Sequence, residues 1–125
     1  ETARFGDTTS GVVFVVRDLF APARPLESAS IVVGQPATDI VRHPTRTGAT
    51  NAKGVARVVG LDGDSVDVVV RRIGYAEVRF ALRLARGCGE TIEVYLRSSG
   101  TMDGEVRAAP PSVARVVRTT CTPPT

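Results

Sequence analysis

The chain has 125 residues, hydrophobic side chains at 42% of its positions and a formal net charge of +3. This length suffices for one domain with its own core, so a structural metal is not needed. No stretch approaches the roughly 18 apolar residues of a membrane span, and the N-terminal residues do not form a signal peptide. We therefore expect one globular domain, either a processed chain or an excised domain, with no membrane span.

The first expected strand is unusually apolar. Residues 1–10 are polar and are expected to form an arm, and the strand follows from Gly11 to Asp18. Its central run is apolar on both faces, whereas one face of a strand in a two-layer sandwich should meet water. Either the chain's own tail or another molecule covers that second face, and a strand near a terminus is also suited to strand addition between subunits. The residues of this candidate partner-binding run are Val12, Val13, Phe14, Val15 and Val16.

Shorter elements are expected next. Ser28 to Gly34 has the alternation of a second strand, and Gln35 to Pro44 carries prolines that favour a short edge strand or an irregular crossing. Arg46 to Asn51 is expected to pair briefly. A turn of Asn, Lys and Gly then leads into a β-branched strand from Val55 to Leu61.

Three longer strands with clear period-2 alternation are expected at Ser65 to Arg72, Tyr75 to Leu84 and Glu90 to Arg97. No helix is expected, because Pro and Gly are frequent throughout the chain. The side chains expected to face the core are Val66, Val68, Val70, Val78, Phe80, Leu82, Leu84, Ile92, Val94 and Leu96.

The residues at the turns and strand ends of this region occur in the order of a known family pattern. They are Thr50, Asn51, Gly54, Gly60, Leu61, Gly74 and Tyr75. With these residues, roughly Gly11 to Arg97 resembles the carboxypeptidase regulatory-like domain, a prealbumin-like (transthyretin-like) sandwich. The resemblance implies an all-β, Greek-key-like sandwich of about seven strands, and it carries no chemistry. It predicts an arm at 1–10, a sandwich at 11–98 and a C-terminal extension at 99–125, which lies outside the family's pattern.

The two cysteines, Cys88 and Cys121, are expected to form a disulfide that ties the C-terminal extension to the sandwich. A disulfide implies an oxidising setting, so we expect a secreted or cell-surface protein. The alternative is a pair of reduced cysteines in the cytoplasm. A metal site is less favoured, because it needs more ligands than two thiols and the distant His43.

Catalytic constellations are not apparent in the sequence. His43 is the only histidine, and no nucleophile elbow occurs, so we expect no enzyme and no catalytic residue. One enzyme of the transthyretin-like fold, hydroxyisourate hydrolase, uses several histidines and a C-terminal Tyr-Arg-Gly-Ser, which residues 95–99 only faintly echo. Asp62, Asp64 and Asp67 lack the spacing of a calcium loop and are expected in a solvated turn, so neither metal nor cofactor is expected.

Arginine supplies 15 of the 16 basic residues. The outward positions could meet phosphates or acidic sugars, but carboxylates alternate with them, so a salt-bridged face is favoured over a nucleic-acid groove. The arginines are Arg71, Arg79, Arg83 and Arg97, and the carboxylates are Asp67, Glu77 and Glu93.

These observations predict a noncatalytic extracellular module that acts by protein association, with other copies of itself or another surface protein, as in a filament or surface assembly. Val113, Val116 and Val117 give the tail strand character and are expected to contact partners. The alternative is a carbohydrate- or ligand-binding accessory domain of a larger secreted protein. This alternative ranks second, because the chain has no Trp and two Tyr, few aromatics for a sugar platform.

Overall fold

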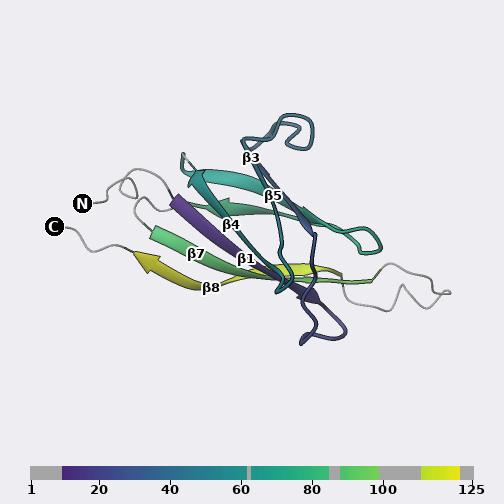
Figure 1. The fold of residues 1–125 in the computed structure, drawn as a ribbon. Coiled ribbons are helices and arrows are strands. Elements are labelled where there is room, and N and C mark those ends of the chain that lie inside the picture. The colour runs from purple at the N-terminus through teal and green to yellow at the C-terminus, as the bar shows by residue number, and fades with distance from the viewer. Residues whose placement is uncertain (1–9, 62, 85–87, 99–110, 122–125) are drawn as a thin grey trace.

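The computed structural model describes residues 10–61, 63–84, 88–98 and 111–121. Within these ranges it contains eight β-strands and no helix, which confirms the predicted all-β class (Figure 1). Residues 1–9 of the arm, residues 99–110 and residues 122–125 lie outside the described residues. The strands are β1 (Ser10–Asp18), β2 (Ser30–Gly34), β3 (Arg46–Ala49), β4 (Val55–Leu61), β5 (Ser65–Arg71), β6 (Val78–Arg83), β7 (Cys88–Leu96) and β8 (Val113–Cys121).

The strands form two four-stranded sheets, with the orders β4-β1-β7-β8 and β3-β2-β5-β6. The sheets pack face to face as two layers (Figure 1) and enclose the main core. The alternation predicted for β6 and β7 is confirmed: Leu82, Ile92, Val94 and Leu96 are buried in this core, and Phe80 packs against it while partly buried.

The apolar strand β1 lies in the interior of its sheet, antiparallel to β4 on one side and parallel to β7 on the other. Both of its backbone edges are therefore paired, so β1 has no free edge for strand addition between subunits, one of the two arrangements considered from the sequence. Val12, Phe14 and Val16 are each 0% exposed because they face the opposite sheet. These three residues were wrongly predicted to contact a partner, whereas Val13 and Val15 lie on the other face and are half-buried.

The C-terminal extension supplies an additional strand. β8 pairs antiparallel with β7 and ends beside the start of that strand, where Cys88 and Cys121 are register partners and form the predicted disulfide. Because β8 extends the sheet laterally, it does not lie over β1, and the described part of the tail does not cover the second face of that strand. The valines predicted in the tail, Val113, Val116 and Val117, are exposed by 42%, 48% and 45%.

The other sheet has a covered outer face. Val32 and Val69 point away from the main core and form a second small core with Ile40, which is 0% exposed. Ile40 belongs to the irregular crossing after β2, which folds back over the sheet. Gly34 permits this packing, because a Cβ there would lie 2.5 Å from the Ile40 Cγ2 atom. The apolar residues on both faces of β5 are thus buried by the chain itself.

The turn between β3 and β4 has the chemistry expected from the sequence. The Asn51 Oδ1 atom accepts hydrogen bonds from the Lys53 and Val55 amides at 2.9 and 3.1 Å. Gly54 has a φ of +77°, and a Cβ at this position would lie 2.6 Å from the Val16 carbonyl oxygen. The turn therefore needs glycine both for its backbone conformation and for the close approach to β1.

Candidate functional site

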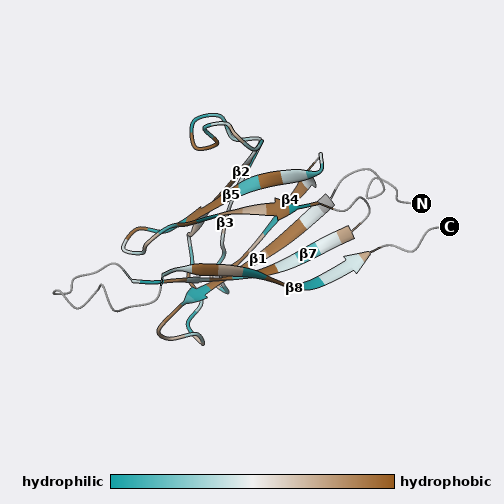
Figure 2. Ribbon diagram, turned by 180° about the vertical axis from the view of Figure 1, so that it is seen from behind, coloured by the Kyte–Doolittle hydropathy of each residue, from teal (hydrophilic) through white to brown (hydrophobic). Residues whose placement is uncertain are grey.

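The candidate site lies on the solvent side of the β4-β1-β7-β8 sheet, which we call the outer β1 face. Strand alternation and the cross-strand register place one set of residues from each strand on this face. Its apolar centre runs along β1 and β4, and β1 is hydrophobic along most of its length in Figure 2. The face includes Gly11, Val13, Val15, Arg17, Val55, Arg57, Val59, Gly89, Thr91, Glu93, Tyr95, Val113, Arg115, Arg118 and Thr120.

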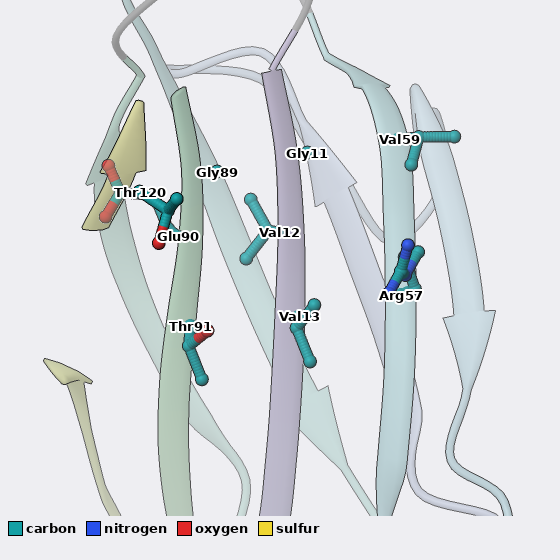
Figure 3. A pocket seen from close by; sticks show the side chains of 9 residues that line it. All are labelled: Gly11, Val12, Val13, Arg57, Val59, Gly89, Glu90, Thr91 and Thr120. Carbon is teal, nitrogen blue, oxygen red and sulfur yellow. The ribbon is translucent and has the colours of Figure 1, made fainter. Parts of the chain in front are cut away.

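A shallow depression of about 410 Å³ marks one end of this face. Gly11 and Gly89 are register partners on the neighbouring strands β1 and β7, and they leave bare backbone at its centre (Figure 3). Val59 stands on the β4 side and Thr120 on the β8 side. The side chain of Val59 is 59% exposed although it is a large aliphatic group.

The fold does not require glycine at either of these two positions. Neither residue has a positive φ. A Cβ on Gly11 would approach Val59 to 3.6 Å, and one on Gly89 would approach the Gly11 carbonyl oxygen to 3.7 Å, both ordinary van der Waals distances. Glycine inside a strand weakens it relative to larger residues. The missing side chains therefore shape the surface without being needed for packing.

The two sheets differ in what covers their outer valines. Ile40 buries Val32 and Val69 on one sheet. On the outer β1 face, Val13 and Val15 are shielded only in part, and no described residue packs over them as Ile40 does over its cluster. The surplus apolar side of β1 noted in the sequence is therefore left on the surface of the described chain.

Polar groups border the apolar centre. The Glu93 carboxylate accepts a 2.9 Å hydrogen bond from the Tyr95 hydroxyl and forms a 3.3 Å ion pair with Arg115. The hydrogen bond from Tyr95, together with Arg115, lowers the pKa of Glu93 below its ordinary value despite some desolvation. On the opposite side, Arg57 is exposed on β4. An apolar centre with a polar, charged border is the arrangement found in protein interfaces.

A partly buried acid–phenol pair at the end of β1 was not anticipated from the sequence. Asp18 is 6% exposed and accepts hydrogen bonds from the Tyr75 hydroxyl at 2.8 Å and from the Phe20 and Ala21 amides at 2.8 and 3.1 Å. Burial raises the pKa of Asp18, but these donors and the nearby Arg24 outweigh it, so the pKa lies below its ordinary value. Burial and the bond to Asp18 raise the pKa of Tyr75. The pair joins the two sheets and is a structural contact.

The remaining sequence candidates do not come together in a reactive site. His43 lies on an exposed part of the crossing after β2, and its amide donates to the Asp39 carbonyl. Among the described residues, no group of three or more His, Cys, Asp or Glu side chains is placed to hold a metal ion. The same part of the chain has no helix long and apolar enough to cross a membrane. Asp62, named in the acidic turn, lies outside the described residues.

Among the described residues, fold and surface define a two-sheet β-sandwich in which Ile40 covers apolar residues on one outer face and nothing comparable covers those on the other. No family model matches the sequence, and no curated protein matches it. The chain is similar to a solved structure, the Bacillus anthracis TIE protein, with a TM-score of 0.59 and 20% sequence identity. The similarity covers 73% of this chain and 17% of the TIE protein chain. At this identity the likeness is one of fold alone.

Proposed function

We propose that this chain is a noncatalytic extracellular β-sandwich that associates with further copies of itself, as a repeating subunit of a surface assembly. The observation that carries the proposal is the uncovered apolar centre of the outer β1 face, on Val13, Val15 and Val59. Contiguous exposed apolar surface bordered by polar groups is typical of interaction sites. The depression at Gly11 and Gly89 supplies a recess into which a side chain of a neighbouring copy fits.

The extracellular setting is supported by the disulfide between Cys88 and Cys121. Disulfides persist in oxidising compartments and are rare in the cytosol. The cross-link also attaches the exposed strand β8 to the body of the sandwich. A subunit that works outside the cell thereby keeps its C-terminal strand in a fixed position.

A second candidate function is that of an accessory module that binds a carbohydrate or another small ligand within a larger secreted protein. Two observations favour it. The similar region takes up only 17% of the TIE protein chain. A groove of about 480 Å³ near the turn after β5 is lined by hydroxyl and charged groups, with an aromatic ring beside them. The lining residues are Ser28, Ser30, Arg71, Arg72, Ile73, Tyr75 and Glu77.

Sedimentation equilibrium of three single variants tests the association. Val59→Thr keeps the β-branched shape but makes the centre of the face polar, and Gly89→Thr fills the depression. Ile73→Thr is the matched control, because Ile73 is 96% exposed on a turn outside this face. Full burial of a valine contributes about 1.5–3 kcal/mol, so we expect Val59→Thr to weaken association on the order of tenfold.

We expect Gly89→Thr to weaken association as well, with no loss of folding stability, and Ile73→Thr to leave it unchanged. A wild-type chain that stays monomeric at high concentration would refute self-association. If such a monomer bound immobilised glycans, and Arg71→Ala removed the binding, the accessory-module function would take its place.

A further inference from the structure

A second surface lies on the opposite side of the molecule from β4, where both sheets end. β6 is the last strand of one sheet and β8 the last strand of the other. Between them opens a groove of about 140 Å³ that reaches down to the core. Its floor includes Leu82 and Ile92, which are 4% and 0% exposed, and Val116 of β8 stands at its border.

β8 is a long edge strand that is already held in place. It spans nine residues, and only Ala114 among them is half-buried while the others are exposed. One end is fixed by the disulfide at Cys121. At the other end, the Ser112 hydroxyl accepts a bond from the Arg97 amide and donates to the Ala76 carbonyl, both at 2.8 Å. Because β8 is already ordered, a partner that binds its edge does not have to reduce the conformational entropy of this strand.

The free edge of β8 lacks several of the devices that protect edge strands, although it carries two arginines and a register shift. Edges are commonly blunted by shortness, by proline or by a covering loop. β8 contains no proline, and within the described residues its outer edge has no paired strand. A register shift opposite Thr91 and Ile92 interrupts the pairing with β7 and divides the strand. The part at residues 114–116 borders the groove.

The charges on β8 and β6 indicate which kind of strand fits the free edge of β8. β8 carries Arg115 and Arg118 and no acidic residue, and both arginines point to the solvent side of the sheet. β6, across the groove, carries Arg79 and Arg83 and again no acid. Arg115 already pairs with Glu93 on β7, whereas Arg118 has a neutral register partner, Thr91.

We propose that the free edge of β8 accepts an extended acidic segment of a partner protein, which adds to the sheet as a further strand. In such a strand alternate residues face opposite sides. Carboxylates on the solvent side then lie beside Arg115 and Arg118, while apolar side chains on the inner side enter the groove over Leu82 and Ile92. Main-chain pairing supplies the affinity and the alternating side chains supply the specificity.

A second copy's β8 is a poor occupant of this edge. Antiparallel pairing of β8 with itself, centred between Val116 and Val117, places Arg115 of one copy opposite Arg118 of the other. Like charges directly opposite each other are destabilising. Arg115 and Arg118 also belong to the outer β1 face, whereas Val116 borders only the groove, so variants of Val116 test the edge separately.

Fluorescence polarisation with defined peptides tests the proposal. The probe is a capped nine-residue peptide in which valine and glutamate alternate, and its counterpart replaces every glutamate with lysine. We expect the glutamate peptide to bind and the lysine peptide to bind at least tenfold more weakly. N-methylation of alternate backbone amides along one edge of the glutamate peptide should abolish binding, because a strand needs those donors.

Two charge-reversing variants locate the site. We expect Arg118→Glu to weaken the glutamate peptide about tenfold, and the matched control Lys53→Glu, on the turn before β4, to leave it unchanged. Val116→Thr should weaken the peptide without altering the charge preference. Equal binding of both peptides, tolerance of N-methylation, or weakening by Val59→Thr in place of Arg118→Glu would overturn the proposal. So would loss of self-association in Val116→Thr, because Val116 lies outside the outer β1 face and the occupant of the edge would then be another copy.

Discussion

Removal of the disulfide is expected to destabilise the protein and to release one strand in particular. Cys88 and Cys121 are 33 residues apart in the sequence. On the chain-entropy model, closing a loop of that length contributes about 3.7 kcal/mol at 25 °C. Whole domains are typically stable by about 5–15 kcal/mol, so the Cys88→Ser/Cys121→Ser double variant loses a large share of its free energy of unfolding. Urea denaturation at neutral pH measures this loss.

The loss of stability should appear first as local unfolding of β8 and only then as unfolding of the whole domain. Apart from its pairing with β7, β8 is held by the half-buried Ala114, by the ion pair of Arg115, by a hydrogen bond from Thr119 to Glu90 and by the disulfide, and the Ser112 bonds hold the residue before it. In the double variant we therefore expect amide hydrogen exchange in β8 to accelerate far more than exchange in β1. Wild-type protein treated with a reductant is the control and should behave like the variant. Unchanged exchange in β8, or a loss below about 1 kcal/mol, would refute the reasoning.

Three further predictions concern the core and the pair at the end of β1. Gly34→Ala should lower the free energy of unfolding by about 1–3 kcal/mol by overpacking, whereas Gly89→Ala should raise it slightly, and equal effects in urea denaturation would contradict the packing described. Phe14→Ala should cost about 3–5 kcal/mol by leaving a cavity, and a loss under about 1 kcal/mol would place Phe14 outside the core. The pKa of Asp18 is lowered on folding, so its stabilisation is present above the unfolded value of about 3.9 and is lost as the pH falls through the folded pKa. Tyr75→Phe removes one donor to this carboxylate and should flatten the fall in stability between about pH 5 and 2, as followed by urea denaturation at each pH, and an unaltered pH profile would refute the role of the bond.

The fold class followed from local patterns that survive in the structure. Alternation in β6 and β7 identifies the inward side chains, because the two faces of these strands meet different surroundings. The position of β1 within its sheet could not be predicted in this way. It depends on pairing with β4 and β7, which is a long-range choice that a strand's own residues do not encode.

The same limit applies to the candidate site. The apolar residues Val13 and Val15 indicated an extra apolar surface from the sequence alone. The depression could not be predicted, because it arises from Gly11 and Gly89, which are far apart in sequence and are register partners. Neither glycine is informative alone. The burial of Val69 could likewise not be predicted from the sequence, because it depends on Ile40 folding back over the sheet. Asp18, at the end of a largely apolar strand, was a local signal of a buried polar contact.

Concentration-dependent methyl NMR of valine- and isoleucine-labelled protein tests the association surface most directly. We predict that the methyl signals of Val13, Val15 and Val59 shift or broaden as the protein is concentrated. Those of Ile73, which is 96% exposed on another surface, should stay in place. Constant signals from the three valines, or changes confined to Ile73, would contradict the account.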